Sequence, residues 1–387
     1  MQSKMDLTTQ NKVDRMIASA EQWLKEHDYR YVECNYVPER LFTRNRKINL
    51  MLRTAFRLLP FNPRSKKDMA AAPLTPHTTV AMLKAFSLKG DRHVAAMLAQ
   101  RVFDHLQSPA TKAFSLRQGI RVAVNLYEDN GDDPSPLNTV FFGEFLLDSD
   151  IIDDDTRRKT VLSICDYLVN ELGYRDHGED GIYFYYGHHL KDIIYNASAF
   201  ISAFLIKSGT RYERPDYVSL GERGLTYIMR NQNSDGSWFY YGPPLKKAID
   251  GFHQCYILKA LMDSQPLSGI DMTQSIARGM AFYKTQFRES GKYLVPQRYD
   301  RRFNPKNTWL LQKIDGRDIS EALTFFSLYA PDPERVEKLV NYMYDKIYRP
   351  DSGRLSPEIF IYGRNRNDYI EFYGWYLHAL YCVKKMV

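Results

Sequence analysis

The stretch DGIYFYYGHHLKDII at residues 180–194 returns 55 residues later as DGSWFYYGPPLKKAI at residues 235–249, and nine of the fifteen positions are identical. Each copy runs into a segment with apolar residues at helical spacing. A weaker third copy begins at Phe360 and leads into a segment that ends at Leu380, and residues 316–323 resemble a further, divergent copy. A fixed period of this kind is typical of an array of supersecondary units, each of which buries its apolar face against its neighbours.

Outward from the repeat, most of the chain has the apolar spacing of helices. Residues 82–106 keep an apolar stripe that is broken at Lys89-Gly90-Asp91, which predicts a helix, a turn and a second helix. The same spacing predicts helices over residues 156–172, 195–206, 217–230, 248–262, 271–287, 319–328, 333–347 and 368–383. Strand signals are confined to short aromatic runs at residues 181–186 and 237–241. The pattern predicts an almost all-α chain.

The period also indicates how many units the chain contains. Residues 71–387 amount to 317 residues, or about six units of 55. Six helix pairs can close into a ring with one helix of each pair inside, so we expect an (α/α)6 toroid with short β-turns or hairpins at one mouth. An open solenoid would have the same period. Residues 1–70 are expected to form an N-terminal helix and a basic connecting segment on the outside.

Composition excludes several classes of protein. The 387 residues include 28 Tyr, 21 Phe, 4 Trp and only 4 Cys, which does not fit a disordered, collagenous or disulfide-stapled chain. No apolar run approaches 20 residues, so no membrane span is predicted. The first ten residues lack the apolar segment of a secretory signal, and the dispersed cysteines fit reduced, buried thiols. We therefore expect a cytoplasmic protein.

The net charge of +7 suits an acidic substrate or an anionic membrane face. The basic residues form no long block, which argues against a nucleic-acid partner. The densest basic stretch covers residues 40–57 and continues at residues 64–67, and we interpret it as a solvated helix face and linker.

In a toroid, the segment just before each inner helix lies at one mouth of the barrel. The repeated aromatic elements occupy that position, so we expect one aromatic rim, made by Tyr185, Tyr186, Trp238, Tyr240, Tyr241 and Tyr362. Aromatic rings with polar tips suit sugar rings, whose C–H faces stack and whose hydroxyls need partners. The alternative is that these rings pack the turns onto their neighbours.

Asp250 and His253 lie three residues apart at the start of a predicted helix and therefore share a face. They could act as a general base with an orienting carboxylate. The alternatives are an N-cap for Asp250 and a core histidine for His253. Acidic residues recur at other predicted inner-helix starts, as Asp318 and Glu371.

His188 and His189, followed by Asp192, invite a metal interpretation, but no metal-binding spacing accompanies them. We favour substrate contacts, with a divalent metal as a minor alternative and no cofactor expected. Arg364 and Arg366 take the place of these residues in the third copy, where they could bind a carboxylate. The sequence contains no P-loop, nucleophile elbow or dinucleotide fingerprint.

Residues 232–238, QNSDGSW, resemble the repeat motif of the terpene cyclase and protein prenyltransferase toroids. Residues 232–261 more closely resemble a family encoded in bacterial capsule, exopolysaccharide and O-antigen gene clusters, which is similar to the C-terminal helical domain of D-glucuronyl C5-epimerases. The family's Ile-Asp-Asn-Phe-His run is met at residues 249–253 with Gly251 in place of Asn. The likeness extends loosely over residues 55–385 and includes a short polar motif around Asn196.

This resemblance implies an enzyme of bacterial surface polysaccharide biosynthesis that works by proton abstraction, as a uronate C5-epimerase or lyase. It makes Tyr241, Tyr185, His253 and Tyr373 candidates for proton transfer, with Arg364 and Arg366 set against the uronate carboxylate. The substrate would be an oligosaccharide or polysaccharide, acidic or lipid-linked, with peripheral association at the inner membrane or with glycosyltransferases. The Asp-rich motif of terpene cyclases is not found at a helix mouth, which argues against terpenoid cyclisation.

Two further functions stay open on the same fold. A glycoside hydrolase would need two opposed carboxylates, Asp250 with Asp318 or Glu371, about 5–10 Å apart. A non-catalytic glycan-binding or assembly protein would use the aromatic rim alone.

Overall fold

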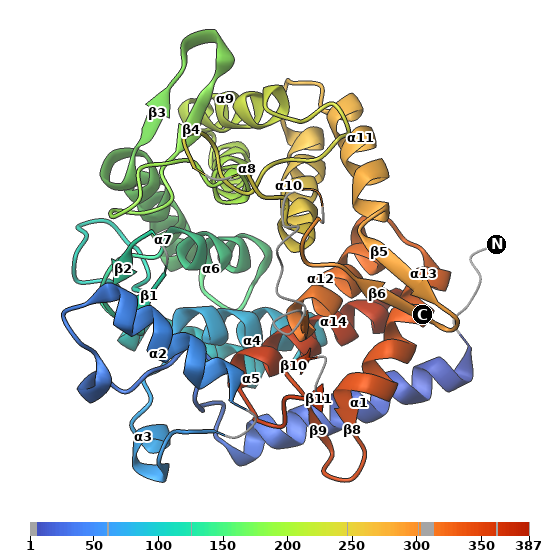
Figure 1. Cartoon of the computed structure of the whole chain (residues 1–387). Helices are drawn as coiled ribbons and strands as arrows, with labels where there is room; N and C mark the ends of the chain where they lie inside the picture. The colour runs from blue at the N-terminus through green and yellow to red at the C-terminus, as the bar shows by residue number, and fades with distance from the viewer. Residues whose placement is uncertain are drawn as a thin grey trace.

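The computed structural model describes residues 6–59, 62–124, 126–245, 247–300, 302, 313–360 and 363–386. Six helices follow one another around a central axis, and the last packs against the first, so that the ring is closed (Figure 1). These inner helices are α4 (Pro76–Lys89), α6 (Pro136–Asp148), α8 (Tyr195–Arg211), α10 (Gly251–Ser264), α12 (Gly316–Thr324) and α14 (Ile370–Met386). The prediction of an (α/α)6 toroid is confirmed.

Each inner helix has an outer partner. Five of the partners follow directly in the sequence, as α5 (Arg92–His105), α7 (Asp154–Asp166), α9 (Pro215–Arg230), α11 (Thr273–Lys284) and α13 (Pro333–Tyr342). The sixth comes from the other end of the chain, since α1 (Leu7–Glu26) packs on α14 and α13. A division of the chain at residue 70 stays a prediction.

Sequence explains which helix of a pair lies inside. Almost every residue of α8 is buried, whereas α9 buries only one stripe that includes Tyr217, Leu225 and Ile228. A helix that is apolar on all sides has to be enclosed, and one with a single apolar stripe can face solvent. The predicted break after α4 is confirmed: Gly90 ends the helix with a φ of 83°, and the Asp91 carboxylate then caps α5 by accepting from the Val94 backbone N–H at 3.2 Å.

Short antiparallel hairpins connect the helices. They are β1 (Val122–Ala123) with β2 (Glu128–Asp129), β3 (Tyr174–Asp176) with β4 (Ile182–Phe184), β5 (Phe287–Ser290) with β6 (Tyr293–Pro296), and β8 (Tyr348–Arg349) with β9 (Arg354–Leu355). A three-stranded sheet has the order β11 (Gly363–Arg364), β10 (Glu358–Phe360), β7 (Lys313–Asp315). The aromatic run at 181–186 contains β4, and the run at 237–241 makes a single bridge, from Tyr241 to Ile194. The remaining strands are too short to give a sequence signal.

The segment before the first inner helix carries α2 (Arg46–Leu58) and α3 (Lys66–Ala70). Two of its arginines point inward, contrary to a wholly solvated basic stretch. Arg57 donates to the carboxylate of Glu358, with Nε at 2.8 Å. Arg64 is 4% exposed and donates from Nε to the Tyr36 carbonyl oxygen at 2.8 Å. Buried guanidiniums of this kind hold the segment to the toroid because each would be costly without its partner.

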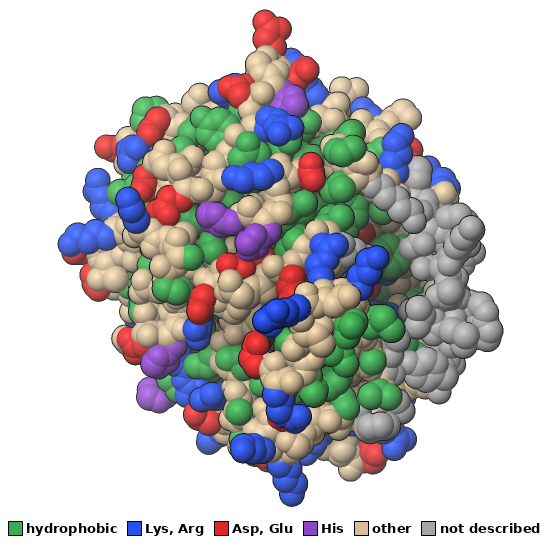
Figure 2. Space-filling model, turned by 60° about the vertical axis from the view of Figure 1, so that its left-hand side comes forward, with side chains coloured by type: hydrophobic (Ala, Val, Ile, Leu, Met, Phe, Trp, Pro, Cys, Tyr) green, Lys and Arg blue, Asp and Glu red, His purple; other side chains and the backbone are tan. Residues whose placement is uncertain are grey.

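The four cysteines are buried and free. Among the described residues, no helix has both the length and the apolar character needed to cross a bilayer. On the face shown in Figure 2, basic and acidic side chains are interspersed with apolar ones, so that no block of one sign covers it.

Candidate functional site

A cavity of about 310 Å³ opens at the end of the ring where the inner helices begin. All six inner helices contribute to its wall, near their first turns, through His77, Asn138, Asn196, Phe252, His253, Arg317 and Glu371 among others. The expectation that the starts of the inner helices meet at one mouth therefore agrees with the fold. Helix N-termini carry a partial positive charge, and six of them at one end of a cavity favour an anionic group in it.

One wall of the cavity is built around His253. The Asp250 carboxylate caps α10 by accepting from the Phe252 backbone N–H at 3.0 Å, and its other oxygen lies 3.2 Å from Nδ1 of His253. Arg298 bridges two acids: its Nε lies 3.4 Å from Asp250, and its Nη1 donates to Asp318. His253 and Arg298 both line the cavity, whereas the two carboxylates lie behind them. The two acids hold the Arg298 guanidinium, and Asp250 places a negative charge beside the His253 imidazole.

The electrostatics of this wall follow from burial. Burial raises the pKa of Asp318 to about 7, and Asp315 and Asp250 add to this, against the opposing effect of Arg298. Burial acts in the same direction on Asp250, but Arg298 and His253 outweigh it, and the pKa of Asp250 ends below its usual value. Asp250 is therefore ionised near neutrality, while Asp318 binds a proton far more readily than a free carboxyl group does.

A pair of buried carboxyl groups, Glu33 and Glu371, forms part of the facing wall. Glu33 accepts from the hydroxyls of Thr75 and Thr78, and Glu371 accepts from the Cys34 backbone N–H at 2.9 Å. Burial raises the pKa of Glu33 despite the two hydroxyls. Burial and the neighbouring Glu33 raise the pKa of Glu371. This pair is suited to holding a proton.

Arg317 and His77 lie beside the carboxyl pair. Arg317 makes a two-pronged contact with Asp315, from Nε at 2.9 Å and from Nη2 at 2.7 Å. The Trp375 indole N–H donates to Nε2 of His77 at 3.4 Å. Burial, assisted by Arg317, lowers the pKa of His77 to about 4, so its imidazole is neutral near pH 7.

The ring places the two histidines on opposite sides of the cavity. His77 belongs to α4 and His253 to α10, which are separated by two inner helices in either direction around the ring of six. Both side chains line the cavity. A ligand in this cavity can therefore meet an imidazole on each of two faces.

Aromatic side chains line the same space. Two of the predicted rim residues, Tyr186 and Tyr240, are among them, together with Tyr127, Phe252, Tyr256 and Trp375. Asn196 also lines the cavity, and its buried Oδ1 has no hydrogen-bond partner in the described structure. Buried polar atoms are normally satisfied, so an unpaired Oδ1 facing a cavity is typical of a ligand-binding position.

The other predicted aromatic residues lie outside the cavity lining. Trp238 is fully buried, and its indole N–H donates to the Ile228 carbonyl oxygen at 2.9 Å, which braces the turn against α9. Tyr373 stacks on Trp23 with ring centroids 4.0 Å apart. Tyr185 packs against the core under Lys191, and Tyr241 bridges to the preceding repeat at Ile194. Tyr362 lies outside the described residues.

The predicted charged residues divide in the same way. His189 and Glu371 line the cavity, and Asp318 supports it through Arg298. His188 is exposed and does not line it. Arg364 and Arg366 are exposed on the C-terminal side of β10, where Nη2 of Arg364 donates to the Asp345 carbonyl oxygen at 2.8 Å. Neither arginine lines the cavity.

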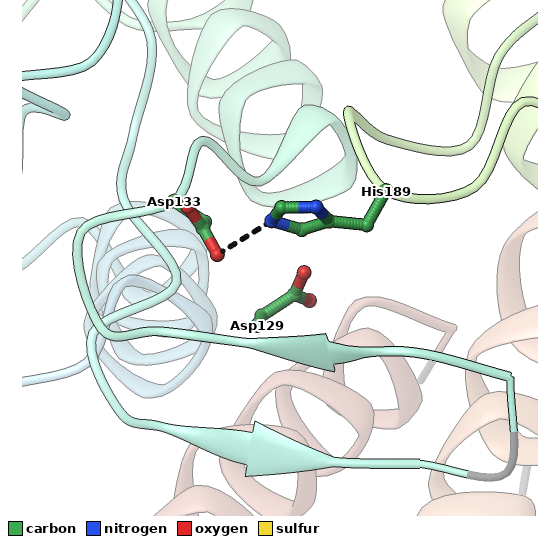
Figure 3. Close-up of side chains that lie close together, drawn as sticks. All are labelled: Asp129, Asp133 and His189. Atoms are coloured by element: carbon green, nitrogen blue, oxygen red, sulfur yellow. Dashed lines mark hydrogen bonds and ion pairs between the residues drawn. The ribbon is translucent and has the colours of Figure 1, made fainter.

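One group of side chains at the mouth has the donor types of a metal site. Asp129, Asp133 and His189 each offer an atom within 4.8 Å of the others, and His189 Nε2 lies 3.0 Å from Asp133 (Figure 3). Burial, together with Asp133, raises the pKa of Asp129 to about 7. Carboxylate and imidazole donors would suit a divalent ion, but Asp192 is not part of the group. The expectation that no cofactor is needed stays a prediction.

The sequence patterns did not single out Glu33, His77, Arg298, Arg317 or Trp375. A usable signal exists for two of these: His77 and Arg317 are the second residue of their inner helix, as are Asn196, Phe252 and Glu371. Aligning the starts of the inner helices would have found them. Glu33 and Arg298 come from connecting segments and have no such signal.

No protein-family model and no curated protein sequence matches the chain. Its fold is similar to that of cellobiose 2-epimerase from Spirochaeta thermophila, with a TM-score of 0.56 and 13% identity over 81% of this chain and 87% of the other. It is also similar to a family 76 glycoside hydrolase (mannosidase) from Bacteroides thetaiotaomicron, with a TM-score of 0.57 and 11% identity over 98% of each chain. An unsaturated glucuronyl hydrolase from a Bacillus species has a TM-score of 0.54 and 14% identity over 96% of each chain. At these identities the likenesses establish the toroid fold.

Proposed function

We propose that this chain is a carbohydrate-active enzyme that moves a proton at a sugar carbon, as an epimerase does. The observation that carries the proposal is the placement of His77 and His253 on opposite inner helices with one polar cavity between them. Inversion at a carbon requires removal of a proton from one face and its return to the other, so a base and an acid on opposite sides are what the reaction needs.

A sugar is the substrate class that suits the lining. Seven Phe, Tyr and Trp side chains supply flat apolar faces, while Asn196, His253 and the two arginines supply polar contacts at fixed positions. The structural neighbours that are named for an activity include an epimerase acting on cellobiose and hydrolases acting on glycosides. These names support a carbohydrate substrate without fixing the reaction.

The residues divide into two half-sites. The Asp250 carboxylate lies 3.2 Å from Nδ1 of His253 without the geometry of a hydrogen bond, and at this distance its charge stabilises the imidazolium that forms when the ring takes a substrate proton. On the facing wall His77 is neutral, and the raised pKa values of Glu33 and Glu371 suit this pair to binding a proton and delivering it to the second face. Arg298 and Arg317 also line the cavity, where their charges can balance negative charge on the reacting carbon.

We infer that the substrate carries a carboxylate, as a uronate does. Arg298 and Arg317 and six helix N-termini face the cavity, and a carboxylate next to the reacting carbon would both bind there and acidify the proton. Cytoplasmic work on a bacterial surface polysaccharide is part of the proposal and rests on the resemblance of residues 232–261.

A glycoside hydrolase is the second candidate, favoured by two of the neighbour names. Asp250 and Asp318 do not line the cavity and are both held by Arg298. The carboxyl groups that do line it include Glu33 and Glu371, which lie side by side on one wall, since Glu371 contacts the backbone next to Glu33. A hydrolase needs carboxyl groups on both sides of the scissile bond, and Asp129 of β2, which also lines the cavity, would have to face this pair across the ligand. We place proton transfer first because two imidazoles line the cavity from opposite inner helices.

The test is hydrogen exchange in deuterated water, followed by proton NMR. Glucuronate-containing oligosaccharides and neutral disaccharides are incubated with the wild type, with His253→Gln and with His77→Gln. We expect deuterium at the carbon next to the carboxylate, and a rate about 10²–10⁴-fold lower for each variant. The matched control is His105→Gln, an exposed histidine on α5 that should leave the rate unchanged. Glycosidic cleavage without exchange would replace the proposal by the hydrolase, and exchange that survives both cavity variants would refute the histidine assignment.

A further inference from the structure

The outward face of α2 carries apolar side chains that nothing in the described structure covers. Ile48 is 44% exposed and Met51 is 70% exposed. Leu126, which is 38% exposed, lies on the turn of the β1–β2 hairpin, and α2 packs against β1 of that hairpin. Seven large hydrophobic side chains are exposed among the described residues, and three of them are found here. Exposed apolar side chains are individually ordinary, but several of them on a helix and on the hairpin that packs against it favour an interaction surface.

The sequence between Glu39 and Asp68 is basic. Residues 40–67 contain nine Lys and Arg and no Asp or Glu. Arg57 and Arg64 are used internally, as described above. Arg44, Arg46 and Lys47 at the start of α2 are exposed, as are Lys66 and Lys67 on α3. None of these five has a carboxylate within ion-pair distance among the residues that the structure describes, whereas Arg40 at the start of the stretch pairs with Asp68 at 2.7 Å.

The inner side of α2 is firmly attached, so the outer side is available without unfolding. The side-chain amide of Asn49 donates to the Thr43 carbonyl oxygen at 2.9 Å and to Glu128 at 3.1 Å, and Arg57 ties the other end of the helix to Glu358. Figure 1 shows α2 on the outside of the ring, next to β1 and β2. A fixed helix with an exposed apolar and basic face resembles an interfacial helix.

We propose that α2, with the basic residues before it and on α3, docks on an anionic lipid bilayer. Unpaired cations are attracted to acidic headgroups, and Ile48, Met51 and Leu126 can enter the boundary between headgroups and acyl chains. A nucleic acid or an acidic polysaccharide would match the charge but would leave these apolar side chains without a partner. The observations therefore favour the bilayer.

Docking by this face would bring the cavity close to the lipid. Val122, Val124, Tyr127 and Asp129 of the β1–β2 hairpin line the cavity, and α2 packs directly on this hairpin. A glycan carried on a membrane lipid would then reach the mouth of the cavity without leaving the membrane surface.

The test is co-sedimentation of the full chain with phosphatidylcholine vesicles, with and without phosphatidylglycerol. We expect binding only to the anionic vesicles, weakened by salt. Arg46→Gln and Lys47→Gln should each lower the partition coefficient about five-fold, since each cation near such a surface contributes about that factor. Ile48→Ser with Met51→Ser should lower it about ten-fold.

Matched controls keep the test specific. Lys112→Gln and Leu267→Ser change an exposed cation and a 39% exposed leucine elsewhere, and both should bind like the wild type. The α2 variants should retain the wild-type unfolding midpoint and the wild-type rate on a water-soluble substrate, which separates this proposal from the proposed activity. Lack of binding to anionic vesicles, an equal loss in the control variants, or binding to a soluble polyanion but not to vesicles would each overturn the proposal.

Discussion

Arg298 is the residue whose removal tests the electrostatics of the site most directly. It is the cation shared by two buried acids, Asp250 at 5% and Asp318 at 4% exposure. Arg298→Met removes the charge but keeps an apolar stem of similar length. Breaking a buried ion pair by deleting one partner costs about 3–5 kcal/mol, so we expect a loss of that size in the free energy of unfolding near pH 8.

The loss in the free energy of unfolding of Arg298→Met should increase as the pH rises. The pKa of Asp318 is raised in the folded wild type and should rise further in the variant, so the folded variant binds a proton that the unfolded chain releases. Because both folded forms keep this proton below the wild-type pKa of about 7, the Asp318 contribution lowers stability relative to the wild type as the pH rises from about 6 to about 9. Urea unfolding followed by far-ultraviolet circular dichroism at both ends of this range measures the effect.

Two further variants test whether the lost stability comes from the buried carboxyl groups that Arg298 pairs with. Adding Asp318→Asn to Arg298→Met removes the stranded charge and should recover part of the loss near pH 8. Arg214→Met breaks an exposed ion pair with Asp216 and should cost about 1 kcal/mol or less. A cost for Arg298→Met below about 1 kcal/mol, or no recovery with Asp318→Asn, would show that the acids are not held as described.

The remaining predictions concern the buried Trp238, two turn glycines, Asp318 and the candidate metal group. Trp238→Phe should lower the free energy of unfolding by about 2–4 kcal/mol, because it opens a gap and leaves the Ile228 carbonyl unpaired, and should leave kcat/KM unchanged; a selective rise in KM would make Trp238 a substrate contact. Gly236→Ala should cost at least about 2 kcal/mol by urea unfolding, because Gly236 has a φ of 89° and a Cβ would lie 2.2 Å from the Arg278 carbonyl oxygen. Gly90→Ala, with a similar φ and open space, should cost about 1 kcal/mol, and equal costs at the two glycines would contradict the steric argument. Asp318→Asn should gain stability over the wild type as the pH rises from about 4 to about 7, since the ionised wild-type carboxyl is disfavoured in the folded state, and a flat difference would contradict the raised pKa. Dialysis against a chelator should leave the exchange rate unchanged, and a loss reversed by Mn²⁺ would place Asp129, Asp133 and His189 in the reaction.

The internal repeat predicted the toroid because both copies encode the same turn between helices. Gly181 and Gly236 occupy equivalent positions in the two copies, and both have a positive φ with a neighbouring carbonyl oxygen where a Cβ would be. The identical tyrosines make the turn, but only one of each pair lines the cavity: the second in the first copy, Tyr186, and the first in the second copy, Tyr240. Sequence identity between the copies therefore predicted the scaffold and could not predict which ring faces the ligand.

The polar side chains of the cavity do not follow the sequence repeat. Six polar residues of the cavity lie at the second or third position of an inner helix: His77, Asn138, Asn196, His253, Arg317 and Glu371. A side chain one residue into a helix points back toward its N-terminus, and in a closed ring that direction is into the mouth. The toroid thus gives six equivalent positions around one cavity, and their side chains can vary without disturbing the packing of the repeat. Because the repeat and the cavity positions are separate, the internal repeat identifies the fold strongly and the reaction weakly. Substitution at the second residue of an inner helix should therefore change the activity before it changes the stability.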